Sequence, residues 1–241
     1  MLPVVILAGG IASRLYPITK KIPKSLININ GKPFIHHQLK LLRQKHVKDV
    51  IICLGTFGER IETFVGNGLW WDLNVRYSHD GSPLLGTGGA VKNALHLLPD
   101  VFFVMYGDSY LDIDLTELEK KYHTEKKSIL MTVYRNDNKN DKSNILVKDS
   151  KIISYDKVNP TKEMKHIDYG ISIVHKSVFD SYNGVFDLAT VFHDYIKKDQ
   201  VSCFETITPF FEIGSFKGIE RLKQHIGDKN DRDSSIFSTN S

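Results

Sequence analysis

The residues best suited to chemistry lie near the start of the chain, in the segment 7–26, LAGGIASRLYPITKKIPKSL. Gly9 and Gly10 carry no Cβ, so their backbone lets a ligand approach closely. Arg14 adds a planar guanidinium and Lys24 a point charge, and both groups bind phosphate oxygens. The segment therefore predicts a loop that binds a polyphosphate. It has neither the Gly-Lys-Ser/Thr ending of a Walker loop nor the spaced glycines of a dinucleotide fold.

A second candidate group is the carboxylate of Asp108, which follows the apolar run 101–105 and the flexible Gly107. An aspartate at the end of a buried strand is well placed to hold a hard cation against phosphate oxygens. An aspartate that only forms a turn is the alternative at this position.

A third group is the segment 82–90, SPLLGTGGA, which precedes an expected helix. Its small residues allow a flat base to lie on the backbone, and Thr87 offers a hydroxyl beside it. A plain N-capped helix would explain Thr87 but not the three glycines. The segment is therefore interpreted as a site for the base of a nucleotide.

These groups need elements that place them together. The first half of the chain alternates apolar runs rich in β-branched residues with stretches of helical spacing. We expect strands at 4–8, 50–54, 73–77 and 101–105, and helices at 33–44, 59–65 and 90–98. Such alternation predicts an α/β fold with a doubly wound, mainly parallel sheet, whose ligand site lies beyond the carboxyl ends of the strands.

The second half has a different pattern, with strand-like segments at 129–134, 145–147, 152–155 and 167–174 separated by polar turns. It is expected to form an antiparallel extension of the sheet and the opposite wall of the crevice. Ser215 is placed to cap a final helix over 216–226. A single domain over 1–226 is expected, followed by a mobile tail over 227–241 that is rich in Asp, Asn and Ser.

Composition limits the classes of function. The 241 residues carry a formal charge of +4, but basic and acidic residues are interleaved, so no nucleic-acid track is expected. Cys53 and Cys203 lie far apart in apolar stretches and are expected to be buried thiols. No apolar run is long enough for a signal sequence or a membrane span, so a cytoplasmic protein is expected.

The segment 7–26 resembles the signature of the sugar-1-phosphate nucleotidyltransferase family, usually Gly-Gly-x-Gly-Thr-Arg-Leu, then Pro and Thr, then Pro-Lys. Ala12 stands in place of the usual glycine and Ser13 in place of the threonine. The matching residues are Gly9, Gly10, Arg14, Leu15, Pro17, Thr19, Pro23 and Lys24. The resemblance spans about residues 3–226 and implies one Rossmann-like α/β domain with a mixed sheet.

The resemblance implies roles on the nucleotide side. It makes Arg14, Lys24 and Asp108 catalytic: Arg14 would bind the departing pyrophosphate and Lys24 the α-phosphate. Asp108 and Glu212 would hold Mg²⁺, because the segment 211–215, FEIGS, resembles the late metal-binding segment of the family. The nucleotide is expected to contact Leu7, Ala8, Gly9, Gly10, Ser13, Arg14, Lys24, Pro83, Gly86, Thr87 and Gly88.

On the acceptor side, the segment 153–157, ISYDK, resembles the Glu-Lys segment whose lysine holds the sugar phosphate, with plain surface charge as the alternative. Ser143-Asn144 stands where the family often has Tyr-Gly, and Asp168-Tyr169-Gly170 where it often has Asn-x-Gly. The expected contacts with the sugar phosphate are Asn144, Asp156, Lys157, Asp168 and Gly170.

The implied reaction transfers a nucleoside monophosphate to a sugar 1-phosphate and releases pyrophosphate. Leu-Gly-Thr-x-Gly-Ala at 85–90 looks like the base-recognition segment of guanylyltransferases that act on mannose or heptose phosphates, so GTP is favoured. The uridylyltransferases of muramic acid phosphate share Tyr77-Ser78 and Pro83-Leu84. A uridylyl- or cytidylyltransferase acting on a sugar or a non-sugar phosphate, a non-catalytic sensor of sugar nucleotides, and a homo-oligomer all stay open.

Overall fold

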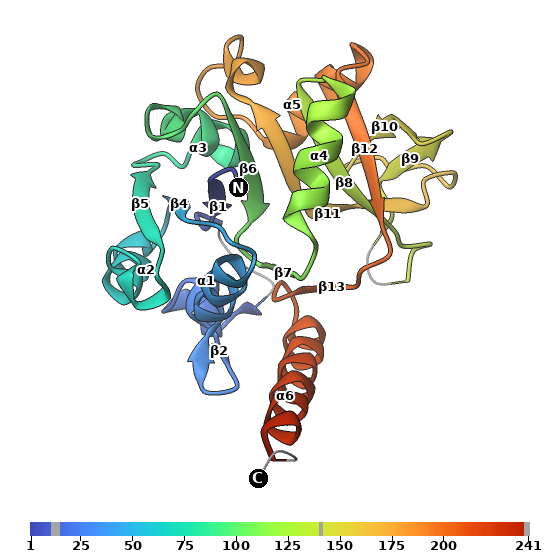
Figure 1. The fold of residues 1–241 in the computed structure, drawn as a ribbon. Helices are drawn as coiled ribbons and strands as arrows, with labels where there is room; N and C mark the ends of the chain where they lie inside the picture. The colour runs from blue at the N-terminus through green and yellow to red at the C-terminus, as the bar shows by residue number, and fades with distance from the viewer. Residues whose placement is uncertain (11–14, 140–141, 239–241) are drawn as a thin grey trace.

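The computed structural model describes residues 1–10, 15–139 and 142–238 of the chain. Their central feature is one nine-stranded sheet in the order β10-β9-β11-β6-β1-β4-β5, with β8 beside β11 and β12 beside β8 (Figure 1). The strands are β1 (Val4–Leu7), β4 (Asp49–Leu54), β5 (Asn74–His79), β6 (Val101–Tyr106), β8 (Ile129–Arg135), β9 (Ile145–Lys148), β10 (Lys151–Tyr155), β11 (His166–His175) and β12 (Val201–Thr206).

The two halves of this sheet differ in direction. Strand β1 pairs in parallel with both β4 and β6, and β4 pairs in parallel with β5. Beyond β6 the sheet becomes antiparallel, because β11 runs against β6, β8 and β9, and β9 runs against β10. This arrangement confirms the predicted α/β fold with a doubly wound sheet and an antiparallel extension. Strand β12, which was not predicted, pairs in parallel with β8.

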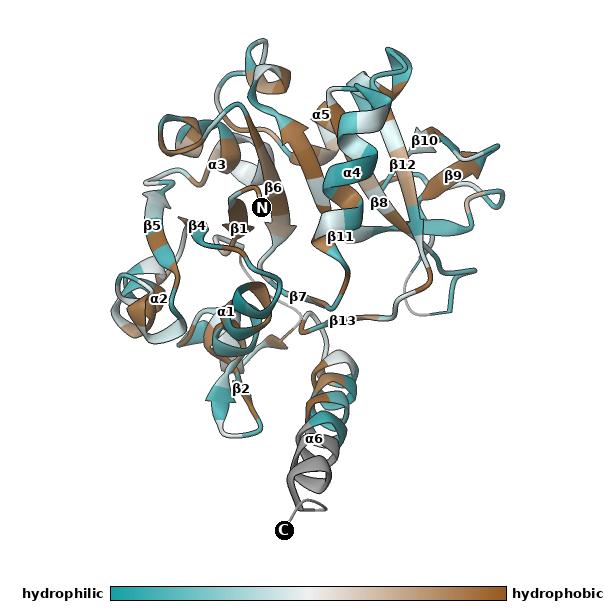
Figure 2. Cartoon of the chain, viewed as in Figure 1, coloured by the Kyte–Doolittle hydropathy of each residue, from teal (hydrophilic) through white to brown (hydrophobic). Residues whose placement is uncertain are grey.

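Helices cover both faces of the sheet, and the alternation of side chains along β1 divides the core between the two faces. Val4 and Ile6 belong to the core that includes α1 (Phe34–Gln44), α2 (Gly58–Val65) and α4 (Leu115–Glu125). Val5 belongs to the other core, formed with α3 (Gly86–Ala94) and α5 (Leu188–Lys197). Because both faces of the central strands are buried, these strands are apolar throughout, as Figure 2 shows in brown.

Two short strand pairs and the last helix form a third core beside the sheet. Strand β13 (Phe210–Glu212) pairs with β7 (Ser109–Leu111), and β2 (Asn28–Ile29) pairs with β3 (Lys32–Pro33). Helix α6 (Phe216–Ser238) begins directly after β13 and packs Ile219, Leu222 and Ile226 against residues of the β2 and α1 region. This packing brings the segment around Glu212 next to the segment that follows Asp108.

Two helices have bounds that differ clearly from the prediction. Helix α3 begins at Gly86 instead of residue 90 and ends at Ala94, where the 3₁₀ turn Leu95–Leu97 follows. The final helix extends from Phe216 to Ser238, beyond the predicted end at 226, so the segment from 227 continues a helix. The mobility expected for 227–241 stays a prediction. None of the helices in the described ranges combines the length and the apolar content that a membrane span needs.

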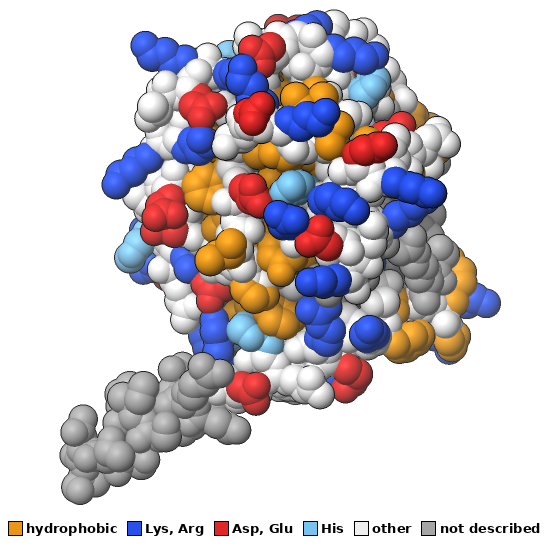
Figure 3. All heavy atoms as spheres, turned by 90° about the vertical axis from the view of Figure 1, so that its right-hand side faces the viewer, with side chains coloured by type: hydrophobic (Ala, Val, Ile, Leu, Met, Phe, Trp, Pro, Cys, Tyr) orange, Lys and Arg blue, Asp and Glu red, His pale blue; other side chains and the backbone are white. Residues whose placement is uncertain are grey.

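The face at the right of Figure 1, which is turned toward the viewer in Figure 3, carries β9, β10 and β12. Basic and acidic side chains are mixed across it, and hydrophobic side chains gather between them. The mixture of charge on this face follows from the interleaving of Lys and Arg with Asp and Glu along the chain.

Candidate active site

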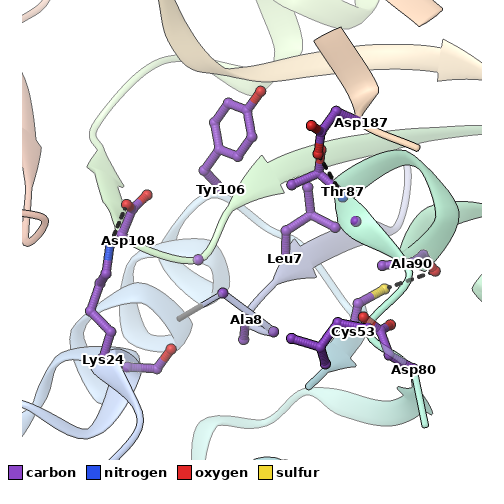
Figure 4. Close-up of a pocket in the computed structure, with 16 residues that line it drawn as sticks. Leu7, Ala8, Lys24, Cys53, Asp80, Thr87, Ala90, Tyr106, Asp108 and Asp187 are labelled. Carbon is purple, nitrogen blue, oxygen red and sulfur yellow. Dashed lines mark hydrogen bonds and ion pairs between the residues drawn. The ribbon is translucent and has the colours of Figure 1, made fainter. Parts of the chain in front are cut away.

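A cavity of about 320 Å³ opens at the carboxyl ends of β1 and β6 (Figure 4). This is the position at which ligands bind in open α/β sheets. It is lined by Leu7, Ala8, Gly9, Gly10, Lys24, Ser25, Cys53, Asp80, Leu84, Gly86, Thr87, Ala90, Tyr106, Gly107, Asp108 and Asp187. The structure thus brings together eight of the predicted site residues: Leu7, Ala8, Gly9, Gly10, Lys24, Gly86, Thr87 and Asp108.

The glycine pair after β1 lies where two strand ends approach each other. A Cβ on Gly9 would lie 3.0 Å from the backbone nitrogen of Gly55, so a side chain at this position would force the two loops apart. A Cβ on Gly10 would meet no atom within 4 Å. Gly9 therefore allows the close packing of the loops, whereas Gly10 leaves open backbone beside the cavity. Ser13 and Arg14 lie outside the described residues, so their predicted roles stay predictions.

An ion pair between Lys24 and Asp108 lies in the cavity lining. The Nζ atom of Lys24 donates to Oδ2 of Asp108 at 2.8 Å, and the side chains are 20% and 34% exposed. Lys24 begins the 3₁₀ turn Lys24–Leu26, and Asp108 follows β6, so two segments far apart in sequence supply the pair (Figure 4). The pair places one cation and one anion at the same end of the cavity.

Glu212 does not line the cavity, and in the β13–β7 pair it lies opposite Ser109, the residue after Asp108. The backbone N–H of Ile213 donates to the carbonyl of Asp108 at 2.9 Å, which fixes the end of β13 beside Asp108, a candidate metal ligand. The Glu212 carboxylate accepts from the hydroxyl of Ser215 at 2.9 Å and from the backbone N–H of Gly214. Within the described ranges, no group of three or more His, Cys, Asp and Glu side chains is arranged to hold a metal ion.

At the opposite end of the cavity, the hydroxyl of Thr87 is engaged by the protein and is not free for a ligand. Its Oγ1 accepts from the backbone N–H of Leu188 at 2.8 Å and donates to Asp187 at 3.3 Å. Gly88, which was predicted to contact the nucleotide, lies outside the cavity lining, and a Cβ there would lie 2.5 Å from the ring of Phe186. Pro83 is also absent from the lining. Its neighbour Leu84 lines the cavity instead.

Asp80 is a lining residue that the sequence interpretation missed. Its Oδ2 accepts from the backbone N–H of Leu85 at 3.3 Å, whereas Oδ1 is buried and has no hydrogen-bond partner in the described part of the chain. Burial raises the pKa of Asp80 above its usual value, against the smaller opposing effect of the Leu85 amide. A buried polar atom without a partner is costly, so a rotation that turns this oxygen toward the cavity would make the carboxylate a candidate acceptor for a ligand.

Cys53 lies in the same wall and is not reactive. Its thiol is buried, donates weakly to the carbonyl of Ala90 at 3.5 Å, and has its pKa raised by burial and by the nearby Asp80. Cys203 is buried as well. Both cysteines are therefore the buried free thiols that the sequence predicted.

The structure brings together only some of the residues predicted to bind the acceptor. Lys157, Asp168 and Gly170 come together beside Tyr106, an aromatic residue of the cavity wall that was not predicted. Asp156 does not join them, because its Oδ1 accepts from the backbone N–H groups of the next loop at 2.8 Å. Asn144 is held by its backbone to β11 and the loop after β10, and its Oδ1 is buried without a partner in the described ranges.

The chain is similar in sequence to known nucleotidyltransferases. The profile of the nucleotidyl transferase family matches residues 3–153. The chain is 32% identical over 179 residues to D-glycero-alpha-D-manno-heptose 1-phosphate guanylyltransferase of Campylobacter jejuni, with 74% of this chain and 78% of the relative covered. It is 37% identical over 112 residues to N-acetylmuramate alpha-1-phosphate uridylyltransferase of Neisseria meningitidis, covering 46% and 48% of the two chains.

Among solved structures, HddC of Yersinia pseudotuberculosis complexed with GMP-PN superposes with a TM-score of 0.79. It is 26% identical, and the match covers 94% of this chain and all of that one. The fold and the cavity thus define an α/β protein with a cavity at the carboxyl edge of its sheet. The chain belongs to the sugar-1-phosphate nucleotidyltransferase family, whose members transfer a nucleotidyl group to a sugar phosphate.

Proposed function

We propose that this chain transfers a guanylyl group from GTP to a sugar 1-phosphate, with Mg²⁺ as cofactor, and releases pyrophosphate. The observation that carries the choice of base is the carboxylate of Asp80, a lining side chain whose one hydrogen bond in the described part of the chain is with the backbone N–H of Leu85. Guanine offers two adjacent donors, the ring N1–H and the 2-amino group, and a carboxylate accepts from both. Uracil and thymine offer a single N–H between two carbonyls. The guanylyltransferase named above for Campylobacter jejuni and the GMP-PN complex of HddC support the same choice.

The reaction is an in-line attack of the sugar-phosphate oxygen on the α-phosphorus. The nucleophile is already an anion, so the protein has to position two anionic partners and neutralise their charge. Lys24 is a cation that reaches the cavity from the signature loop, and its position beside Asp108 suits the charge that develops on the α-phosphate. Arg14 is proposed to bind the departing pyrophosphate.

Asp108 and Glu212 are proposed to hold Mg²⁺. The donor types fit, because carboxylate oxygens are the hard ligands that this ion prefers, and the contact between Ile213 and Asp108 brings the two segments side by side. Bound there, the ion would supply charge neutralisation for the phosphate oxygens. Each carboxylate is held by protein donors in the structure, Asp108 by Lys24 and Glu212 by Ser215.

The proposed base preference has a direct test. GTP is expected to give a kcat/KM at least about tenfold above UTP, CTP and dTTP, since a wrong base would leave buried polar groups unpaired. The measurement is pyrophosphate release in a matrix of four triphosphates and several sugar 1-phosphates. UTP ahead of GTP would favour the uridylyl alternative, which the similarity to the Neisseria meningitidis enzyme keeps open. Turnover in no combination would favour a sensor.

The role of Asp80 is tested by Asp80→Asn with GTP and ITP, since ITP lacks only the 2-amino group of the base. The wild-type enzyme is expected to prefer GTP over ITP by about tenfold, and the variant by less than about twofold, because the amide cannot accept both donors. The kcat/KM for GTP should fall by about 10- to 100-fold, and that for ITP much less. An equal loss for both nucleotides would remove Asp80 from base recognition.

A further inference from the structure

A compact polar cluster adjoins the cavity at Tyr106, toward the antiparallel half of the sheet. It consists of Tyr106 at the end of β6, Tyr155 at the end of β10, Lys157 in the loop after β10, and Asp168 in β11. Only Tyr106 of these four lines the cavity, and its ring projects between the positions of Asp108 and Asp187 in Figure 4.

Asp168 is the centre of this cluster, and both of its oxygens are engaged by the protein. Oδ2 accepts from the hydroxyls of Tyr155 at 3.0 Å and Tyr106 at 3.1 Å, and Oδ1 accepts from the backbone N–H of Gly170 at 3.0 Å. The side chain is only 5% exposed. Asp168 is thus poorly placed for the hydroxyl-binding role expected from the sequence.

Lys157 is the one cation of the cluster. Its Nζ lies 3.1 Å from the hydroxyl of Tyr106 and 3.8 Å from Oδ2 of Asp168. The same atom lies 4.8 Å from the ring centroid of Tyr106 and 5.4 Å from that of Tyr155, within the range of cation–π attraction. Loss of water around the ammonium lowers the pKa of Lys157, but Tyr106 and Asp168 outweigh this effect and raise it. The negative charge of Asp108 acts in the same direction.

We propose that Tyr106, Tyr155 and Asp168 are positioning residues that form a fixed seat for the ammonium of Lys157, which binds the phosphate of the acceptor. The proposal rests on the proposed function and adds the means by which the acceptor side is preorganised. Asp168 acts through Lys157 and does not contact the sugar. The acceptor is then recognised on this wall by its phosphate, and selectivity for sugar hydroxyls comes from other residues.

The seat has a physical advantage for binding. A free lysine side chain has to give up rotamer freedom when it binds a phosphate, which lowers its affinity. Two aromatic rings, a hydroxyl and a carboxylate hold this lysine before the ligand arrives, so most of that loss occurs during folding. The ammonium retains N–H groups for a phosphate, because Tyr106 accepts from it only once.

The seat can be tested without any substrate by trace acetylation of lysines, read by peptide mass spectrometry. The amine reacts only when it is neutral and free, so Lys157 is expected to react several-fold more slowly than Lys148 and Lys151, which are exposed on the same hairpin. Asp168→Asn should remove most of that difference. Tyr106→Phe keeps the aromatic ring and leaves the carboxylate of Asp168 in place, so it should remove part of that difference in reaction rate. The matched control Asp199→Asn removes a carboxylate from the surface lysine Lys127 and should leave Lys157 unchanged.

The same variants then test the purpose of the seat. With the best substrate pair of the wild-type matrix, Tyr106→Phe and Asp168→Asn are expected to raise the KM for the sugar 1-phosphate by about tenfold, and the KM for the triphosphate by less than about twofold. In a Lys157→Ala background, the two substitutions should raise the KM for the sugar 1-phosphate little further. Inorganic phosphate should slow the acetylation of Lys157 in the wild-type protein.

The outcomes separate the two proposals. Unchanged acetylation of Lys157 in both variants, or an effect of the variants on the triphosphate KM alone, would overturn the seat. Acetylation that responds to the variants and to phosphate, in a protein that turns over no triphosphate, would support the seat and count against the proposed function.

Discussion

Replacing Lys24 by alanine is expected to lower kcat by about 10²- to 10³-fold, because it removes a fixed positive charge from the phosphate at which the reaction occurs. Lys24 is 20% exposed and holds its position through the 2.8 Å contact with Asp108, so its charge is ready before the substrate binds. The measurement is steady-state kinetics at saturating triphosphate and acceptor, together with thermal unfolding to show that the variant is folded.

The control for this variant is Lys21→Ala, which removes an exposed lysine three residues earlier and should leave kcat within about twofold. A Mg²⁺ titration separates two roles for Lys24. If the lysine acts on phosphate, its removal leaves Asp108 free and does not raise the Mg²⁺ concentration that the enzyme requires. Recovery of normal kcat at high Mg²⁺ would mean that Lys24 only organises the metal site.

The sequence predicted the sheet because its central strands are buried on both faces and therefore consist of continuous apolar runs. The start of α3 was not predictable in the same way. Glycine has a low helix propensity, so the segment 86–89 reads as a loop. In the structure the N–H groups of Gly88 and Gly89 both donate to the carbonyl of Phe186, at 3.0 and 3.1 Å. A contact over this sequence distance leaves no local pattern, although it decides where the helix begins.

The site residues also differ in whether a local sequence pattern could predict them. Lys24 and Asp108 carry local signals, a cation in a proline-bounded loop and a carboxylate after a strand and a glycine, and the structure places them in contact. Asp80 follows β5 as Asp108 follows β6, so the same rule applied to every strand end would have found it. Tyr106 had no such signal, because an aromatic residue in a strand is ordinarily part of the core. Its role depends on Lys157 in the loop after β10 and on Asp168 in β11, which only the assembled sheet brings near.

Asp108 has two functions in the structure, and only one of them depends on its charge. Its backbone carbonyl accepts from Ile213 and so connects the end of β6 to β13, whereas its carboxylate faces Lys24 in the cavity. An asparagine keeps the size of the side chain and the backbone contact. Asp108→Asn therefore separates the charge from the fold, which a larger change at this position would not do.

Asp108→Asn is expected to lower turnover by about 10²-fold or more, and to raise the Mg²⁺ concentration needed for half-maximal activity, because the proposed metal site loses an anionic ligand. Kinetics over a range of Mg²⁺ concentrations measure both effects, and thermal unfolding should change little. The matched control is Asp100→Asn at the other end of β6, where the carboxylate forms a surface ion pair with Lys176 and should contribute nothing to catalysis. If Asp108→Asn kept near-normal, magnesium-dependent turnover, Asp108 would be no metal ligand, and its pairing with Lys24 would have to serve the positioning of that lysine alone.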